Sequence, residues 1–325
     1  MFAFIVRRVA GLVVVLFAIS VMTFLIFFAT PGIDPSRQLA GRNPDPATVA
    51  AVKHQFGLDR PLPVRYALMM KRLFISRDLV SYGNQALNVV PAITSATPVT
   101  FSLVIGAAVL WVLGAIVVGL LMVNFRGSII DPLLMILALI GISMPVFWLG
   151  EVANLLTQHR THSWQRVLFG WVPPLEYVPL TQNPWQWFLH LLIPWLTLSV
   201  LYVGFYARVL RANLIEVESE DYVRTARAKG LSPRRVLLKH MLRTSLITFV
   251  SLFGLDFGVL VGGGALLTEV VFGLPGVGLL TYHSLVSLDL PVIMATVLYG
   301  AFFITIMSAL VDILYARLDP RIRPT

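Results

Sequence analysis

The sequence contains no cysteine and few charged residues. The absence of cysteine excludes disulfide bonds, thiol nucleophiles and thiolate metal sites. Charged residues make up only 13% of the chain and hydrophobic residues make up 57%, whereas soluble domains carry about 25% charged residues. This composition predicts an integral membrane protein.

The sequence also lacks the Gly-x4-Gly-Lys-Ser/Thr loop that cradles nucleotide phosphates. The segment GLPGVG at residues 273–278 has neither the lysine nor the hydroxyl of such a loop, so it predicts a turn or a partly inserted loop. His159 and His162 are too few to predict a metal site, because zinc takes three or four protein ligands. We therefore expect no enzymatic activity, no cofactor and no metal in this chain.

Six apolar stretches are long enough to cross the roughly 30 Å hydrocarbon core of a bilayer as helices. They are residues 9–29, 98–123, 132–156, 188–206, 246–267 and 291–315. The net charge is +9, and the basic residues lie beside these stretches, which is typical of membrane orientation and not of nucleic-acid binding. Because they concentrate at both ends of the chain and at residues 208–243, we expect six transmembrane helices with cytoplasmic N and C termini.

This arrangement predicts three parts. Residues 1–30 form an N-terminal anchor and the first helix, residues 31–97 form an extracytoplasmic insertion, and residues 98–325 form the core with a cytoplasmic loop at 207–245. The insertion is too long for a simple connector. Prolines 46 and 63 open two helix-like stretches in it, so we expect a small helical subdomain. It either covers the mouth of a pathway or docks another protein.

The most informative segment is 219–242, SEDYVRTARAKGLSPRRVLLKHML. Ser219 predicts the N-cap of a short helix, with Glu220 and Asp221 in the first turn, where the helix dipole favours anions. Gly230 predicts a left-handed C-cap. A helix of about ten residues is marginal by itself in water, so tertiary or partner contacts must hold it. The alternative interpretation is a basic loop that faces lipid headgroups.

Asp256 lies near the middle of the fifth apolar stretch. An ionised side chain there costs about 2.5–3.5 kcal/mol, so it should face the bundle interior or water. It either lines a pathway or forms a hydrogen bond to another helix. Pro145 and Pro194 predict breaks in the third and fourth spans, and such breaks are tolerated only where they are buried or face water.

A strip of glycines, Gly254, Gly258 and Gly262, repeats every four residues along the fifth span. Small residues at this spacing allow another helix to approach closely. The strip serves either packing within this chain or contact with a second subunit across a translocation axis.

The segment 219–242 resembles the EAA loop of permease subunits in bacterial ABC importers, whose pattern is E-A-A-x3-G-x9-I-x-L-P. Ala226, Gly230 and Leu242 match this pattern. The departures are Arg224 for Glu, Thr225 for the first Ala, His240 for Ile and Arg243 for Pro. The complete sequence of this segment is similar to the form found in the dipeptide and oligopeptide permease branch. Four other segments are also similar to that branch: HQFGLDRPLPVRY, SMPVFWLG, GLPGVG and VDILYARLDPRIR.

The resemblance implies a permease subunit of an ATP-driven importer of peptides or similar small solutes in the bacterial plasma (inner) membrane. It implies a second homologous permease, two cytoplasmic ATPase subunits that hold ATP and Mg²⁺, an extracytoplasmic substrate-binding protein and surrounding membrane lipid. Coupling to the ATPase would involve Asp221, Tyr222, Val223, Arg224, Ala226, Arg227, Lys229 and Gly230. The pathway or the permease interface would involve Asp256, Gly254, Gly258, Gly262 and Pro145.

Two other functions remain open on the sequence. An ion-coupled secondary transporter could use Asp256, although such proteins commonly contain internal repeats, and no convincing repeat is visible. A membrane scaffold without a pathway is the third possibility.

Overall fold

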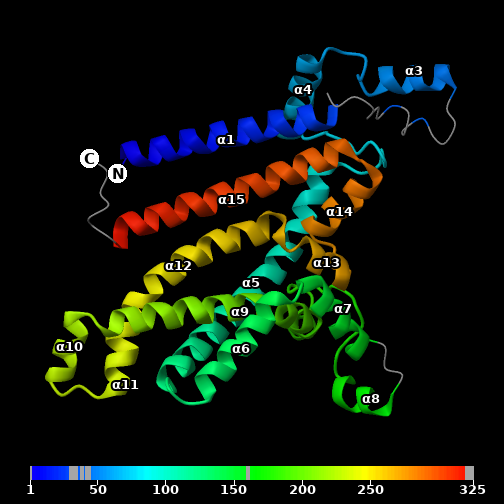
Figure 1. The fold of residues 1–325 in the computed structure, drawn as a ribbon. Coiled ribbons are helices and arrows are strands. Elements are labelled where there is room, and N and C mark those ends of the chain that lie inside the picture. The colour runs from blue at the N-terminus through cyan, green and yellow to red at the C-terminus, as the bar shows by residue number, and fades with distance from the viewer. Residues whose placement is uncertain (1, 29–35, 37–39, 41–44, 159–161, 319–325) are drawn as a thin grey trace. The chain divides into compact units, whose positions relative to one another are not determined.

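The computed structural model describes residues 2–28, 36, 40, 45–158 and 162–318 (Figure 1). Within these residues the regular structure is helical, apart from one isolated bridge between Val80 and Asn88. The predicted all-α class is therefore confirmed for the described part of the chain. The chain divides into two compact units. Unit 1 comprises Met1–Thr100, Val261–Leu266 and Pro275–Ile306, and unit 2 comprises Phe101–Leu260, Leu267–Leu274 and Met307–Thr325.

Unit 1 contains the predicted outer insertion. Its elements are α1 (Phe2–Phe28), α3 (Pro46–Gln55), α4 (Leu62–Lys71), the π-helical turn η1 (Arg72–Ser76), the first turns of α5 (Val89–Asn124), α14 (Val277–Ser287) and the first part of α15 (Leu290–Leu318). The side chain of Asp45 caps α3 by accepting the N–H of Thr48 at 3.0 Å. The two short helices begin within one residue of Pro46 and Pro63, so this part of the prediction is confirmed.

Apolar packing and buried polar contacts hold the insertion within unit 1. Its core includes Phe24, Met69, Leu73, Leu79, Val89, Val292, Met294, Ala295 and Leu298. The hydroxyls of Ser20 on α1 and Tyr66 on α4 lie 2.6 Å apart. Asp289, which precedes α15, accepts the hydroxyl of Ser81 and the N–H of Tyr82. The insertion is thus a packed part of its unit.

Unit 2 is built around the long helix α9. Its elements are the rest of α5, α6 (Ile130–Ser143), α7 (Val146–Thr157), α8 (Ser163–Phe169), α9 (Pro184–Glu218), α10 (Asp221–Ala228), α11 (Pro233–Arg235), the π-helical turn η2 (Val236–Met241), α12 (Leu242–Val259) and most of α13 (Leu266–Phe272). The π-helical turn η3 (Leu260–Gly264) follows α12. Helix α9 packs against α6, α7 and α12. The indole of Trp195 occupies the space over Gly106 and donates to the carbonyl of Ser102 at 2.9 Å.

Five continuous helical stretches among the described residues are long and apolar enough to cross a membrane. They are Val6–Phe28, Val89–Asn124, Pro184–Glu218, Pro233–Gly264 and Leu290–Ile313. Two further pairs are bent at a short break, α6 with α7 at 96° and α13 with α14. The straight stretches overlap five predicted spans, and the predicted third span is the bent α6–α7 pair. Several helices are longer than predicted. Hydrophobicity indicates only the part of a helix that lies inside the bilayer, and it does not indicate where the helix ends.

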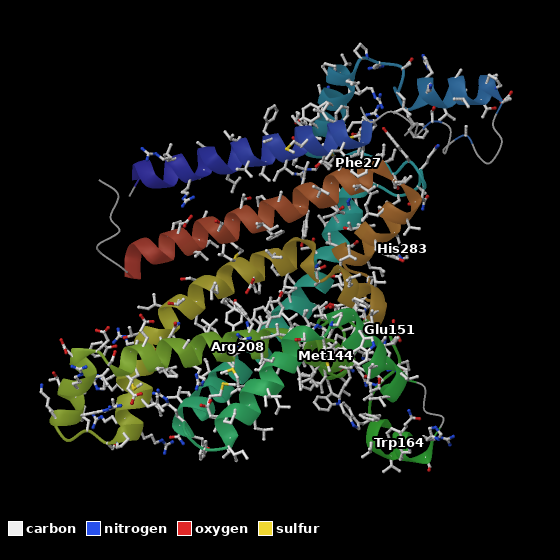
Figure 2. All side chains as sticks on the ribbon, viewed as in Figure 1. Phe27, Met144, Glu151, Trp164, Arg208 and His283 are labelled. Carbon is white, nitrogen blue, oxygen red and sulfur yellow. The ribbon has the colours of Figure 1, made fainter. Side chains whose placement is uncertain are left out.

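Exposed apolar side chains mark a continuous face of α5 in unit 2. Ile105, Val109, Leu113, Val117 and Leu121 recur every four residues and are all exposed. A helix with this spacing presents them on one side, where lipid hydrocarbon can surround them. Exposed tryptophans gather on α8 and on the connection from α8 to α9, including Trp164 in Figure 2. Such tryptophans are typical of a membrane–water interface.

Candidate functional site

The short helix in the basic loop is α10, Asp221–Ala228. Its N-cap is Glu220, whose φ of −69° and ψ of 144° are extended, as a cap requires. The prediction that Ser219 is the N-cap, with Glu220 in the first turn, is wrong by one residue. Ser219 instead ends α9 with a helical backbone, and its hydroxyl donates to the carbonyl of Glu216 at 2.9 Å. The reason is that α9 continues to Glu218, well beyond the predicted span.

The end of α10 follows the prediction. Gly230 has a φ of +76°. Its N–H donates to the carbonyl of Arg227 at 2.9 Å, and the N–H of Leu231 donates to the carbonyl of Ala226 at 3.4 Å. This pair of bonds is a Schellman motif, in which a left-handed residue satisfies the last carbonyls of a helix. The left-handed C-cap at Gly230 is therefore confirmed.

The two sides of α10 differ in burial. Val223 is fully buried and Ala226 is 5% exposed, because α10 packs against η2 and α9 of the same chain. Tyr222 is 41% exposed, and its hydroxyl donates to Thr244 at 3.0 Å. Of the eight residues predicted to couple to a partner, Val223 and Ala226 thus hold the helix in place. The exposed ones are Asp221, Tyr222, Arg224, Arg227, Lys229 and Gly230.

Glu218, the last residue of α9, joins α10 to a second loop. One of its carboxylate oxygens accepts from Arg227 of α10 at 2.6 Å, and the other accepts from Arg126, between α5 and α6, at 3.3 Å. Exposed pairs of this kind contribute at most about 1 kcal/mol each. Nearby, Arg211 of α9 binds Asp131 of α6 through two bonds of 2.9 and 2.7 Å. No local sequence pattern indicates these contacts, because the partners lie 9 to 92 residues apart.

A cavity of about 370 Å³ lies beside α10. Two carboxylates, Glu216 and Glu220, line it together with polar side chains of α9 and α12. One wall includes Tyr222, so movement of α10 would change the shape of this cavity.

Asp256 on α12 has a partner in its own chain. The hydroxyl of Tyr206 on α9 donates to its carboxylate at 2.6 Å. Tyr206 is fully buried and packs edge-on against Phe249 with ring centroids 4.8 Å apart, while Trp111 stacks on Tyr202 at 4.6 Å. Asp256 itself is partly exposed. The structure thus supports the interpretation of Asp256 as a hydrogen-bonded structural group, and its role in a pathway stays a prediction.

The glycine strip packs within this chain. A Cβ at Gly254 would overlap the side chain of Val311 on α15. Gly262 approaches the backbone of Gly300 on α15 so closely that a Cβ would lie 2.8 Å from its carbonyl oxygen. Gly258 is buried. Close approach of α15 therefore accounts for the small residues at Gly254 and Gly262, and a second subunit is not needed to explain them.

Pro145 lies at a break between two helices of unit 2. Met144, labelled in Figure 2, has an extended backbone, and Pro145 is the N-cap of α7. The predicted break at Pro145 is therefore confirmed, and it is a 96° bend. At the buried Pro194, α9 runs through as one helix, so the helix is not interrupted there, and a kink at Pro194 stays a prediction.

Asn154 joins α7 to the end of α13. Its side-chain N–H donates to the carbonyl of Val271 at 2.9 Å, and one turn earlier Gly150 allows Val271 and Phe272 to pack closely. The Leu274 N–H bonds to Glu269, and the Gly273 N–H to Val270. Neither of these two bonds uses the carbonyl of Val271, and this carbonyl accepts the side-chain N–H of Asn154 instead. The predicted span also contains the polar residues Ser143 and Glu151, so nothing in the sequence singles out Asn154 for this contact.

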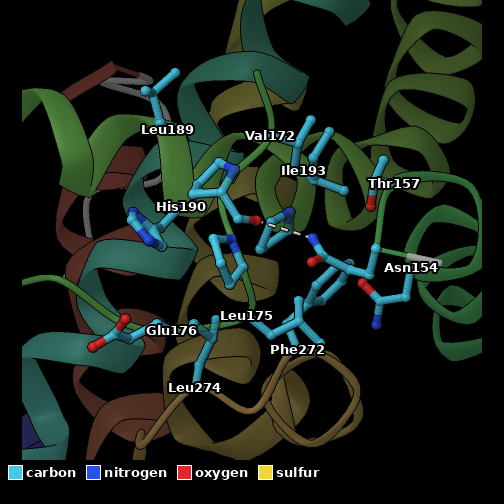
Figure 3. Close-up of a pocket in the computed structure, with 14 residues that line it drawn as sticks. Asn154, Thr157, Val172, Leu175, Glu176, Leu189, His190, Ile193, Phe272 and Leu274 are labelled. Carbon is cyan, nitrogen blue, oxygen red and sulfur yellow. Dashed lines mark hydrogen bonds between the residues drawn. The ribbon is translucent and has the colours of Figure 1, made fainter. Parts of the chain in front are cut away.

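The same asparagine faces a small cavity of about 10 Å³, shown in Figure 3. Its walls also include His190, Glu176 and Gln158, and Gln158 donates to the carbonyl of Pro173 at 3.0 Å. Asn154 is only 5% exposed, and its side-chain oxygen accepts no hydrogen bond from the residues that the structure describes. A space of this size holds about one water molecule.

The histidine pair in the loop before α8 is only partly described. His159 lies outside the described residues. His162 is the N-cap of α8, and its backbone N–H donates to the side chain of Gln165 at 3.0 Å. The structure thus gives His162 a role at a helix end.

Two family descriptions match the chain. Residues 115–324 match "Binding-protein-dependent transport system inner membrane component", and residues 1–104 match the N-terminal region of such membrane components. Among curated proteins, the chain is 36% identical to a putative peptide transport system permease protein of Brucella abortus (strain 2308), over 99% of both chains.

Two further relatives come from Escherichia coli. The glutathione transport system permease protein of strain O6:H1 is 36% identical over 99% of both chains. The probable D,D-dipeptide transport system permease protein of strain K12 is 35% identical over 97% of this chain and 96% of the relative.

Proposed function

This chain belongs to the inner membrane components of binding-protein-dependent transport systems, and we propose that it is the subunit through which an ATPase drives the import of di- and oligopeptides. It is a multi-pass protein of the bacterial inner membrane and a permease component of the ABC type, not an enzyme. Transporters of this family combine such a component with an ATPase and a binding protein. The names of two relatives suggest that the substrate is a peptide.

The observation that carries the proposal is the construction of α10. Its apolar side is buried against η2 and α9 of the same chain, while its charged side is exposed. A helix of eight residues is not stable alone in water, yet here packing and the Schellman motif hold it as a rigid element. A soluble subunit that binds such an element can displace it as a unit, and the element can transmit this displacement to α9 and α12.

The transmission would run through contacts already described. Two partner ATPase subunits would hold ATP and Mg²⁺, and they would contact the exposed side chains of α10. Movement of α10 would reach α9 through Glu218 and the buried Val223, and α12 through Tyr222 and Thr244. The cavity of about 370 Å³ beside α10 would then change shape. Two permease subunits moving together would switch the pathway between inward-open and outward-open states.

The topology in this proposal has six spans with both termini in the cytoplasm. The five straight stretches and the bent α6–α7 pair cross the membrane, and the α13–α14 pair enters from the outer side and returns. The insertion that contains α3 and α4 then lies outside, and α10 lies in the cytoplasm. The basic residues of the α9–α12 loop and of the chain ends support this orientation.

Charge reversal at Lys229 tests the coupling. Lys229 is exposed and is the C-cap residue of α10. We expect Lys229→Glu to abolish ATP-dependent uptake of a labelled dipeptide and to release the ATPase during purification, while the folded chain persists. Lys71→Glu is the matched control, because Lys71 is an exposed lysine at the end of α4 in the outer insertion. Full uptake by Lys229→Glu would remove the coupling role of this surface.

The alternative, ion-coupled transport through Asp256, is not favoured by the family. The hydrogen bond from Tyr206 gives this carboxylate a structural purpose. Uptake driven by a proton gradient in the absence of any ATPase would reverse this preference.

A further inference from the structure

Four cationic side chains at the start of the helical stretch Pro233–Gly264 take no part in the coupling proposed above. They form a basic patch that consists of Arg234, Arg235, Lys239 and Arg243. All four residues are exposed, and within the described part of the chain none of them forms an ion pair. Their charges add up over a short length of helix, so the basic patch attracts a negatively charged surface.

The carboxylates of the nearby cavity lie on another side of α12. Glu216 and Glu220 line this cavity of about 370 Å³, and α12 contributes three hydroxyl residues to it, Thr244, Ser245 and Thr248. At 3.6 residues per turn, Arg243 lies roughly 100–160° around the helix from these three residues. Arg243 therefore faces away from the acidic cavity.

Exposed apolar side chains follow the cations along the same side of α12. Arg243, Ile247 and Val250 are spaced i, i+4 and i+7, which places them on one side of a helix. Ile247 is 36% exposed and Val250 is 38% exposed, and Leu238, the neighbour of Lys239, is 43% exposed. Cations followed by exposed apolar residues are typical of a helix that passes from lipid headgroups into hydrocarbon. Lipid offers both an anionic headgroup and an apolar chain to this side of the helix.

The length of the helical stretch places the basic patch at the level of the headgroups. Pro233–Gly264 has 32 residues, or about 48 Å at 1.5 Å per residue, whereas the hydrocarbon core is about 30 Å thick. Residues 244–264 alone extend about 31 Å, and their only charged residue is Asp256. If they fill the core, Arg243 lies at its boundary and Lys239 about one turn farther out. The headgroup layer is about 5–8 Å thick on each side, so it contains both cations.

We propose that the basic patch binds anionic phospholipid headgroups of the cytoplasmic leaflet, with Lys239 and Arg243 in the headgroup layer. Guanidinium groups bind phosphate oxygens in paired hydrogen bonds, and the lysine adds a compact positive charge. Helix α10 packs against η2, which contains Lys239. Bound lipid therefore holds the base of α10 at a fixed depth in the membrane while the ATPase displaces α10. This inference rests on the proposed function for the side of the membrane on which the patch lies.

The first test needs no partner subunit and uses the absence of cysteine from the chain. A fluorophore on Leu238→Cys reports the lipid beside the basic patch. The full-length chain is reconstituted in phosphatidylcholine, with brominated phosphatidylglycerol or brominated phosphatidylcholine as the quencher. Each basic residue near an anionic leaflet strengthens the attraction by about fivefold. We therefore expect the preference for phosphatidylglycerol to fall by about tenfold or more in Lys239→Gln/Arg243→Gln.

Two control variants separate charge at the basic patch from other effects. Lys71→Gln/Arg77→Gln removes one exposed lysine and one exposed arginine from the outer insertion and should keep the preference. Lys239→Arg/Arg243→Lys retains both charges and should keep it as well.

The wild type supplies a measurement that does not depend on how any variant folds. Raising the salt concentration should weaken its preference for phosphatidylglycerol, because salt screens exposed charges. Equal quenching of the wild type by the two lipids would overturn the lipid site, and so would a preference that survives in Lys239→Gln/Arg243→Gln.

The second test asks whether the ATPase occupies the basic patch instead. The complete transporter is assayed for ATP-driven uptake as the fraction of phosphatidylglycerol in the membrane rises. We expect uptake by the wild type to rise with this fraction, and uptake by Lys239→Gln/Arg243→Gln to respond little while the ATPase remains bound. Release of the ATPase by this variant, with an unchanged lipid preference, would assign the patch to the ATPase and overturn the proposal. If the wild type shows no ATP-driven uptake in any membrane, the proposed function fails, whereas the quenching result still decides the lipid site.

Discussion

Gly230 offers the sharpest test of α10 as a rigid coupling element. Its φ of +76° is left-handed, and a Cβ built on it would meet nothing within 4 Å. Alanine at this position therefore changes only the backbone energy, by about 1–2 kcal/mol for a left-handed residue with a Cβ. If the ATPase requires the intact Schellman motif, a cost of this size weakens its binding by a factor of about 5–30.

The assay is the affinity of the purified ATPase subunit for the reconstituted permease, measured beside ATP-dependent uptake of a labelled dipeptide. We expect affinity to fall in the order Gly230, Gly230→Asn, Gly230→Ala, Gly230→Val. Asparagine tolerates the left-handed region better than alanine, and a β-branched residue tolerates it least.

Gly127 provides a matched control. It has a φ of +85°, a Cβ there also meets nothing within 4 Å, and it lies in the connection between α5 and α6, outside α10. Gly127→Ala should carry a similar backbone cost with little effect on ATPase affinity. Equal affinity for Gly230→Val and the wild type, or an equal loss for Gly127→Ala, would refute the reasoning that the shape of the end of α10 matters.

Three further predictions concern the membrane-embedded part. Tyr206→Phe should lower the free energy of unfolding by about 1–3 kcal/mol, because it leaves the carboxylate of Asp256 without its donor. Thermal unfolding in nanodiscs measures this loss of stability. A smaller loss when Tyr206→Phe is combined with Asp256→Asn would show that the two groups act as a pair. Asn154→Leu should also destabilise the protein by about 1–3 kcal/mol, since the Val271 carbonyl loses its donor; an unchanged unfolding midpoint would contradict the bond between α7 and α13. Asp256→Asn should retain ATP-driven uptake and show no change in its dependence on a proton gradient, and loss of a gradient-driven component would favour ion coupling.

The sequence was most informative where local rules determine the structure. Pro46 began a helix where expected, and Gly230 adopted the left-handed conformation that its place after a basic turn indicated. These outcomes depend on the backbone preferences of one or two residues. Ser219 was placed wrongly because two helices compete for it, and the length of α9 decides which one includes it.

The sequence alone determined that this protein spans a membrane with helices, that it contains a short capped helix in a basic loop, and that it resembles a permease. Hydrophobicity, spacing and turn chemistry act over a few residues and can be read directly. Tertiary structure alone decided that Val223 faces inward, that Gly254 accommodates α15, and that Tyr206 bonds to Asp256. These contacts join residues 50 or more positions apart, or depend on which side of a helix meets a neighbour. They exist only after the helices have packed.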